Sequence, residues 1–106
     1  MPTDSIALTE AVYYILLSLH KPLHGYGIMQ NVMQLSGGRV NLAAGTLYGA
    51  LDTMCKKGWI DELPGEKSSR KKQYIVTKLG HKIAKNEITR LRELLTNGER
   101  LIGGDE

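Results

Sequence analysis

The chain has 106 residues, of which 42% are hydrophobic and 24% charged, with a formal net charge of +3 and a single cysteine. This length allows one domain with a modest core, and one cysteine excludes an intramolecular disulfide framework and fits a reducing compartment. The N-terminus lacks basic residues ahead of an apolar run, and the longest such run, 11–17, is too short to span a bilayer, so we expect a cytoplasmic protein without a secretory leader.

The first predicted helix begins after Thr9, a suitable N-cap, and carries Glu10 in its first turn, where the helix dipole favours an acid. Between residues 11 and 19 nearly every position is apolar, Ser18 being the exception. A helix that is apolar on all sides is buried on more than one of them. Either the other helices surround it or a second copy of the chain covers it.

Residues 24–38, "HGYGIMQNVMQLSGG", predict a second helix. Gly37 and Gly38 are suited to its C-terminal stop, because glycine adopts the left-handed backbone conformation without a steric penalty. The residues expected near one apolar face of this helix are Tyr26, Met29, Val32 and Met33.

Residues 41–59, "NLAAGTLYGALDTMCKKGW", predict a third helix with apolar residues at i, i+4 and i+7. Asn41 is expected to cap its start and Gly58 to end it. The apolar positions are Leu47, Leu51 and Met54.

After Gly58 the pattern changes to two short β-branched and aromatic segments, "WIDEL" and "QYIVT". They predict a hairpin whose loop, 64–71, is longer than most hairpin loops. Residues 66–72 contain four basic residues and one acid, so this segment carries a net charge equal to the +3 of the whole chain. A basic patch on a neutral body indicates a polyanionic partner, and a solvated loop is the alternative interpretation.

Thr77 is expected to cap a last helix that reaches Asn97-Gly98. About 20 helical residues extend roughly 30 Å, while a domain of this size has a radius of gyration near 13 Å. This helix therefore spans or overhangs the domain, which suggests that a second copy covers its apolar stripe. The stripe consists of Leu79, Ile83, Ile88, Leu91, Leu94 and Leu95.

The order helix, helix, helix, hairpin, long helix predicts a mainly α fold with a small β-hairpin, namely a winged helix-turn-helix domain over 1–77. The long helix and tail, 78–106, complete the same compact domain. In such a fold the third helix enters the major groove of DNA and the hairpin, or wing, lies along the neighbouring backbone.

The expected DNA contacts come from the start of the second helix, the start of the third helix and the wing. Small residues let a helix start approach phosphates or base edges closely, although they also suit tight packing. Gly25 is equally suited to a purely structural turn, and Tyr48 to half-buried packing. The full set is Gly25, Tyr26, Ala43, Ala44, Gly45, Thr46, Tyr48, Gly49, Lys67, Arg70, Lys71 and Lys72.

Other residues favour structural roles. Trp59, Tyr74 and Cys55 are expected to pack in or beside the core. His20 and His24 have no cysteine or acidic cluster to complete a metal site, so we expect no metal and no cofactor. No nucleophile–base pair, carboxylate dyad or phosphate-binding loop is recognisable, which excludes an enzyme.

Four stretches resemble the PadR family of bacterial transcriptional regulators: "LTEAVYYILLSL" at 8–19, "HGYGI" at 24–28, "GTLYGALDTMCKKGWI" at 45–60 and "RKKQYIVTKLGHK" at 70–82. They follow the order and spacing of the family. The chain departs from it at Ala43-Ala44, where members often have Ser-Pro, and at 53–55, where many have Arg-Leu-Glu. Its last helix also lacks the tryptophan with which some short, multidrug-responsive members stack flat ligands.

The resemblance implies a homodimeric repressor that binds a pseudo-palindromic operator, with the long helix of one copy packed against the first helix of the other. Tyr13 and Tyr14 are candidates for lining an effector pocket at the dimer seam, and ordinary interface packing is the alternative. A winged-helix module that binds another protein instead of DNA is the competing hypothesis. The interface residues expected are Val12, Tyr13, Leu16, Ile83, Ile88, Leu91 and Leu95.

Overall fold

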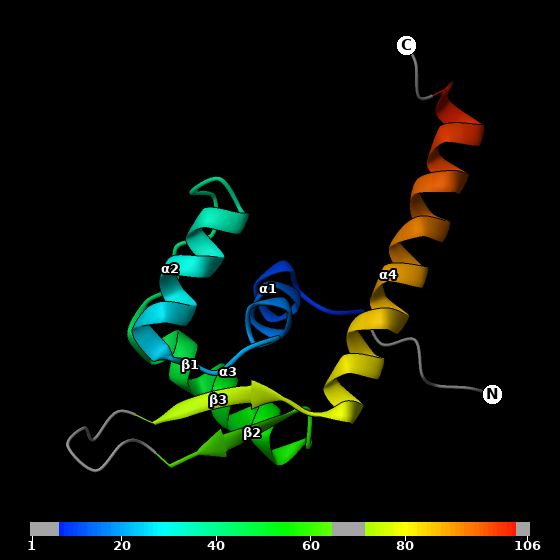
Figure 1. The fold of residues 1–106 in the computed structure, drawn as a ribbon. Helices are drawn as coiled ribbons and strands as arrows, with labels where there is room; N and C mark the ends of the chain where they lie inside the picture. Colours follow the sequence, from blue (N-terminus) through cyan, green and yellow to red (C-terminus); the bar gives the residue numbers. More distant parts are fainter. Residues whose placement is uncertain (1–6, 65–71, 104–106) are drawn as a thin grey trace.

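The computed structural model describes residues 7–64 and 72–103 (Figure 1). The predicted order of helices and hairpin strands is confirmed, and the last helix continues beyond its predicted end into a π-helical turn, Glu99–Gly103. The elements are α1 (Glu10–Ser18), β1 (Leu23–His24), α2 (Gly25–Leu35), α3 (Ala44–Lys56), β2 (Ile60–Leu63), β3 (Gln73–Val76) and α4 (Lys78–Gly98).

The hairpin strands belong to a three-stranded antiparallel sheet in the order β1-β3-β2. In the hairpin, Ile60 pairs with Val76 and Leu63 with Gln73, while β1 adds Leu23 opposite Tyr74. The sequence analysis missed β1, because two residues show no alternation of their own. Its pairing with β3 anchors the hairpin beside the start of α2.

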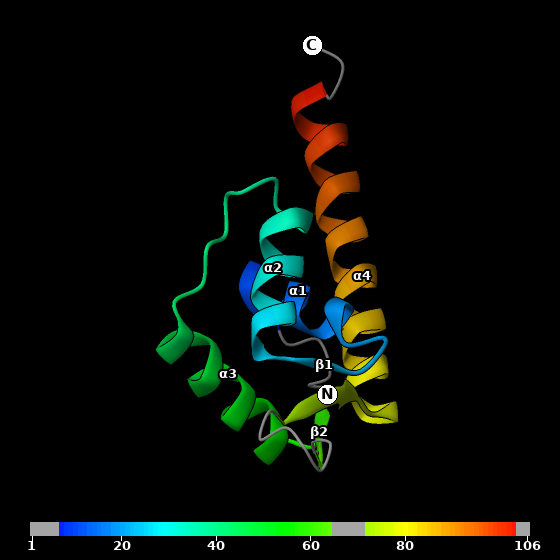
Figure 2. The ribbon, with the colours of Figure 1, turned by 60° about the vertical axis from the view of Figure 1, so that its left-hand side comes forward.

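Helix α1 is the centre of the core and lies between α2 and α4 (Figures 1 and 2). Ser18, the one polar residue in the apolar run of α1, is 0% exposed, and its hydroxyl is hydrogen-bonded within the core. It donates to the carbonyl oxygen of Tyr14 at 2.8 Å and accepts from the Asn31 side-chain amide at 2.9 Å. The buried apolar core is built from α1 and from the helices and strands packed around it. Its members are Ile15, Leu16, Leu19, Ile28, Val32, Leu47, Leu51, Met54, Trp59, Ile60, Tyr74 and Ala84.

The predicted apolar face of α2 is wrong by part of a turn. Gly25, Ile28 and Val32 point into the core, while Tyr26 and Met33 are 60% and 40% exposed. Helix α2 carries two adjacent apolar stripes, and only one can face α1. The other stripe, with Met29 half-buried, faces Asn41 and Leu42 in the segment that leads into α3.

The predicted caps hold at two helices and fail at a third. The hydroxyl of Thr9 accepts from the Val12 amide at 3.1 Å, and that of Thr77 accepts from the Gly80 amide at 3.0 Å. The expected cap of α3 by Asn41 is wrong, because Ala43 occupies the N-cap and a methyl group accepts no hydrogen bond. The predicted glycine stops are confirmed by positive φ angles at Gly37, Gly38 and Gly58.

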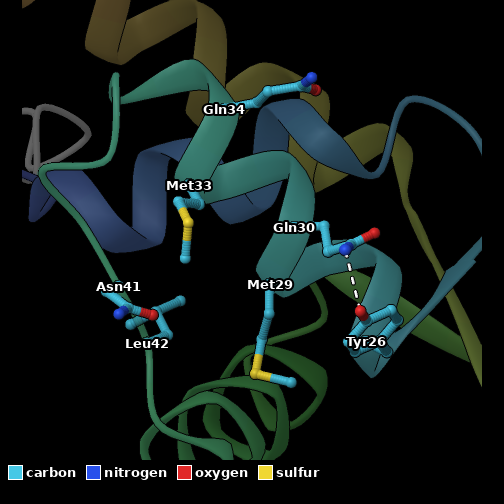
Figure 3. A pocket seen from close by; sticks show the side chains of 7 residues that line it. All are labelled: Tyr26, Met29, Gln30, Met33, Gln34, Asn41 and Leu42. Carbon is cyan, nitrogen blue, oxygen red and sulfur yellow. Dashed lines mark hydrogen bonds between the residues drawn. The ribbon is translucent and has the colours of Figure 1, made fainter.

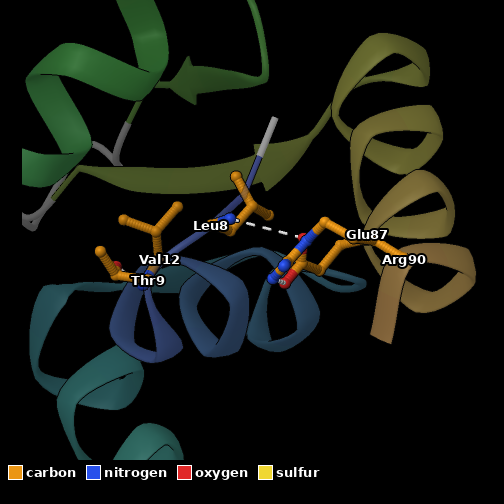
Figure 4. Close-up of polar contacts among 5 residues, drawn as sticks. All are labelled: Leu8, Thr9, Val12, Glu87 and Arg90. Carbon is orange, nitrogen blue, oxygen red and sulfur yellow. Dashed lines mark hydrogen bonds and ion pairs between the residues drawn. The ribbon is translucent and has the colours of Figure 1, made fainter. Parts of the chain in front are cut away.

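The first turns of helix α4 pack closely against the rest of the domain, and its later turns extend into solvent. A Cβ on Gly80 would lie 2.0 Å from the carbonyl oxygen of Trp59, so this approach requires glycine. About two turns further on, the Glu87 carboxylate accepts from the Arg90 guanidinium at 2.6 and 2.9 Å and from the Leu8 amide at 3.4 Å (Figure 4). Residues 91–102 are exposed. No helix in 7–64 or 72–103 has the length and apolarity to cross a membrane.

Candidate nucleic-acid interface

The start of α3 presents a surface of small residues. Ala43, Ala44, Gly45, Thr46 and Gly49 are all exposed, while Leu47 between them is fully buried and anchors the helix. Apart from the neighbouring residues and the backbone of α3 itself, no described atom lies within 4 Å of a Cβ built on Gly45 or Gly49. Because Ala43 cannot cap the helix, the positive end of the α3 dipole has no side-chain acceptor at its N-cap. This arrangement suits a negatively charged or polar partner.

The start of α2 lies against α3 through one aromatic contact. A Cβ on Gly25 would lie 2.2 Å from the Tyr48 hydroxyl oxygen and 2.7 Å from its Cζ, so the Tyr48 ring end rests on the Gly25 backbone. Tyr48 remains 49% exposed. On the next position of α2, the Tyr26 hydroxyl accepts from the Gln30 side-chain amide at 2.9 Å. Two partly exposed tyrosines thus lie near the N-termini of α2 and α3.

An ion pair lies on the described base of the wing, where β2 and β3 pair (the wing stem). The Lys72 ammonium lies 2.9 Å from the Glu62 carboxylate, and this hydrogen bond raises the pKa of Lys72 above its ordinary value. Both side chains are largely exposed, so a phosphate can compete with Glu62 for Lys72. The other predicted wing cations, Lys67, Arg70 and Lys71, lie outside the described residues.

The residues assigned to packing are found in or beside the core. Trp59 and Tyr74 are 8% and 7% exposed, and burial raises the pKa of the Tyr74 hydroxyl. Cys55 is half-buried against the core, and burial, with the carboxylates of Glu62, Asp52 and Asp61, raises the pKa of its thiol. A thiol held protonated is a poor nucleophile.

The predicted dimer-interface residues divide into two groups. Leu16 is 2% exposed inside the core, Val12 and Ile83 pack against the core within the chain, and Tyr13 is half-buried. The remaining three lie on the outer part of α4 and are open to solvent: Ile88, Leu91 and Leu95, at 36%, 40% and 60% exposure.

Surface cavities among the described residues include the following three. One of about 160 Å³ lies between α1 and α4, and one of about 370 Å³ lies between the segment 7–12 and α3. The largest of these three, about 490 Å³, lies between α2 and the segment before α3 (Figure 3). Tyr13 and Tyr14, whose ring centroids are 6.0 Å apart, line none of these three.

Sequence reasoning missed the 490 Å³ cavity, since it placed Met29 and Met33 near the same helical face as Val32 and considered no cavity there. A signal was available: Tyr26 and Gln30 are spaced i, i+4, which places a hydroxyl and an amide on that same outward stripe. Among the residues that the structure describes, no cluster of three or more His, Cys, Asp or Glu side chains could hold a metal ion.

Comparisons with known proteins identify the fold and the family. The sequence model described as "Transcriptional regulator PadR-like family" matches residues 14–86, more than half of the chain. A comparison with curated proteins finds no match.

Several solved structures are similar. A PadR family transcription regulator from Clostridium difficile has a TM-score of 0.74 and 22% identity, with 90% of this chain and 100% of that chain covered. A PadR-like transcription factor from Bacteroides fragilis has a TM-score of 0.72 and 25% identity, with 85% and 87% covered. A PadR family regulator from Eggerthella lenta has a TM-score of 0.71 and 20% identity, with 87% and 80% covered.

The family match covers α1 from Tyr14, all three strands, α2, α3 and the first part of α4, which are the elements of the winged helix-turn-helix. Transcriptional regulators of this kind act by binding DNA, and they are not enzymes. The chain belongs to the PadR-like family of transcriptional regulators.

Proposed function

We propose that the chain acts as a homodimeric repressor that binds a pseudo-palindromic operator through α3 and the wing. The observation that carries this proposal is the uncapped, exposed start of α3, Ala43–Gly49, standing beside the Tyr48–Gly25 contact. In this arrangement Gly45, Thr46 and Gly49 approach base edges, while Tyr26 and Tyr48 donate to phosphates on either side. The basic residues of 66–72 add an electrostatic attraction to the DNA phosphates that does not depend on the base sequence.

The proposed dimer contact is the outer apolar row of α4. Leu94 and Leu95 are 53% and 60% exposed, next to Ile88 and Leu91 on the same helix. Such a continuous apolar row on an overhanging helix is typical of a protein interface. In the proposed dimer the row of one copy packs against α1 and the 160 Å³ groove beside it in the other copy. Dimerisation would place two α3 helices on two half-sites.

The first experiment measures binding of the purified protein to genomic duplex fragments, beginning with the promoter of its own operon, over a range of salt concentrations. If each protomer neutralises about four phosphates, log affinity falls against log salt with a slope on the order of −7 per dimer. The double variant Arg70→Ala/Lys71→Ala should flatten this slope. Lys82→Ala/Arg100→Ala removes the same charge at two exposed residues that line neither the start of α3 nor the proposed dimer groove, and serves as the control.

Repression is tested by a promoter–reporter fusion, in which the wild-type chain should lower expression and the wing variant should not. Failure to bind any genomic duplex at low salt would instead support a module that binds another protein. The dimer is tested by light scattering, where Leu91→Glu should yield a monomer and Thr89→Glu, exposed on the same helix, should not. A dimer that survives Leu91→Glu would exclude this face as the contact.

A further inference from the structure

The described part of the chain contains one buried charged side chain, that of Glu87 on α4, which is 3% exposed. Its carboxylate accepts two hydrogen bonds from the Arg90 guanidinium, at 2.6 and 2.9 Å, and one from the Leu8 backbone amide at 3.4 Å. Arg90 belongs to the same helix, so of these three bonds only the one from Leu8 joins α4 to another part of the chain. Figure 4 shows it reaching from α4 to the residue just before the N-cap of α1.

Stability alone gives no reason to bury a charged pair at this junction. Desolvation of two ions offsets most of their attraction, and apolar side chains of similar size often stabilise a protein as well or better. A hydrogen-bonded ion differs from an apolar contact in being directional, because its energy falls when the angle or the distance changes. The Glu87 carboxylate is therefore suited to fixing the orientation of α4.

Helix α4 is attached to the domain at two specific points. At Gly80 the helix lies so close to Trp59 that a Cβ would come within 2.0 Å of the Trp59 carbonyl oxygen, and at Glu87 it is joined to Leu8. Between them, Ala84 packs in the apolar core, and such contacts are non-directional. The two points lie about 10 Å apart along the helix, so together they define the direction of its axis.

Both points of attachment lie next to α3. Leu8 lines the 370 Å³ cavity together with Ala50 and Met54 of α3, and Trp59, which follows shortly after the end of α3, lines the same cavity. The direction of α4 is thus set relative to α3 as well as to the core. Beyond Arg90 the helix is exposed and carries the apolar row of the proposed dimer contact.

A change of direction at Gly80 grows along α4. Glu87 lies about 10 Å from Gly80 along the helix and Leu95 about 22 Å, so a shift at Glu87 is about doubled at Leu95. In a symmetric dimer held by the outer part of α4, such a shift moves the two α3 helices relative to each other. We propose that Glu87 is a positioning residue that sets the distance between the two α3 helices and thereby the half-site spacing that the dimer accepts. This inference rests on the proposed function.

The first test measures the direction of α4 within one chain and requires no DNA. In a Cys55→Ser background, spin labels on Asp52→Cys in α3 and Thr96→Cys in the exposed part of α4 report one distance by pulsed electron paramagnetic resonance. The labelled chain is diluted into an excess of unlabelled chain, which removes distances between protomers. The chain with Glu87 intact should give a narrow distribution, and Glu87→Gln should shift or widen it by at least about 2 Å.

Two further variants make this test specific. Arg90→Gln leaves a buried carboxylate without its cation, and because this is costly the carboxylate should turn to water and release Leu8. Arg90→Gln should therefore also shift or widen the distribution, and it replaces Glu87→Gln if that chain does not fold. Glu93→Gln removes an exposed carboxylate from the same helix and should change nothing. Folded Glu87→Gln or Arg90→Gln chains with an unchanged distribution would overturn the assignment, as would an equal effect of Glu93→Gln.

The second test separates orientation from stability on DNA. The half-sites of the selected duplex are moved together or apart by up to two base pairs, which turns one half-site by about 70° relative to the other. Wild type should prefer its best spacing by at least about tenfold, whereas Glu87→Gln should bind neighbouring spacings within about threefold of one another or change its optimum.

The outcomes of the two tests are distinguishable. A loss of affinity that is equal at every spacing would show that Glu87 only stabilises the fold, and would overturn the inference. If no duplex is bound in any condition, the proposed function fails and the spacing role fails with it, while the distance within one chain still decides whether Glu87 directs α4.

Discussion

The hydroxyl end of Tyr48 rests on the backbone of Gly25, where a Cβ atom would lie 2.2 Å from its oxygen. This contact joins the start of α2 to the exposed side of α3, two elements that are separated along the chain. Because glycine leaves the space for the ring, the contact fixes the Tyr48 hydroxyl at the surface on which we place the phosphate contacts. The residue pair therefore connects a packing requirement to the proposed binding function.

Gly25→Ala should weaken DNA binding without unfolding the chain. The atom that must move is the far end of a side chain that is 49% exposed, so we expect the free energy of unfolding to change by no more than about 1 kcal/mol. Loss of one hydrogen bond to a charged phosphate corresponds to roughly a tenfold loss of affinity or more. Fluorescence anisotropy with labelled duplex measures the affinity, and urea unfolding measures the stability.

A double-mutant cycle identifies the route of this effect. If Gly25 acts through Tyr48, the double variant Gly25→Ala/Tyr48→Ala should bind DNA no more weakly than Tyr48→Ala alone. Additive losses would show that Gly25 contributes directly, for instance through its own amide.

Gly49→Ala should change stability and DNA affinity in opposite directions. Within the described chain no atom lies within 4 Å of a Cβ at this position, so alanine should stabilise α3 by about 0.5–1 kcal/mol through its higher helix propensity. The added methyl group would lie on the surface that enters the major groove, and we expect the affinity to fall by about tenfold or more. Unfolding and binding measurements on one preparation test both signs, and unchanged affinity would place Gly49 outside the contact.

The wing stem offers a test that depends on the Glu62–Lys72 pair. Glu62→Gln removes the carboxylate 2.9 Å from Lys72, so Lys72 becomes available to a phosphate and the salt slope should steepen by about 1 per protomer. Asp61→Asn is the matched control, because alternate residues of a strand point to opposite faces of the sheet. Equal slopes for the two variants would mean that Lys72 takes no part in binding.

The elements that could be predicted from the sequence are those with one unambiguous apolar stripe. Helix α3 has such a stripe in Leu47, Leu51 and Met54, all buried. Helix α2 has two, and the choice between Ile28 and Met29 depends on where α1 lies, which local periodicity does not contain. Strand β1 is only two residues long and exists because β3 lies beside it.

The candidate site, too, could be predicted from the sequence only in part. The exposed small residues at the start of α3 were recognisable by type, since few side chains there could serve a core. The Gly25–Tyr48 contact and the cavity beside Met33 each join residues that are distant in the sequence, and no spacing rule specifies them. The charge of the wing was evident from composition, whereas the pairing of Lys72 with Glu62 follows from strand register.

Gly80→Ala should destabilise the protein strongly. The new Cβ would lie 2.0 Å from the carbonyl oxygen of Trp59 and 2.8 Å from a methyl carbon of Val76, and the backbone atom cannot move without disturbing the sheet. We expect a loss of about 3 kcal/mol and a fall in Tm of at least about 10 °C. Calorimetry at fixed protein concentration measures the change. Gly98→Ala on the same helix, where nothing described lies within 4 Å of a Cβ, should be nearly neutral, and similar Tm values for the two variants would contradict the close contact.

Glu87 should make stability depend on pH in the acid range. Its carboxylate is 3% exposed, and the hydrogen bonds from Arg90, followed by the one from the Leu8 amide, hold its pKa below the ordinary value although burial acts in the other direction. A group whose pKa is lower in the folded state stabilises the fold above its unfolded pKa, and this contribution is lost as the pH falls through its folded pKa. The interaction is therefore fully present at neutral pH, begins to decline near the unfolded pKa of about 4.3, and is lost as the pH falls through the lower folded pKa.

Glu87→Gln tests this dependence by comparison with wild type at each pH. At pH 7 the variant should be less stable by about 2 kcal/mol, because the Arg90 guanidinium, whose side chain is 24% exposed, loses its charged partner. The difference should shrink as the pH is lowered from about 5 to 3, because wild-type Glu87 is protonated there as well. Glu93→Gln, exposed on the same helix, is the control. Urea unfolding across this range provides the measurement, and a constant difference between wild type and Glu87→Gln would show that the carboxylate charge does not stabilise the junction of α4 with the segment before α1.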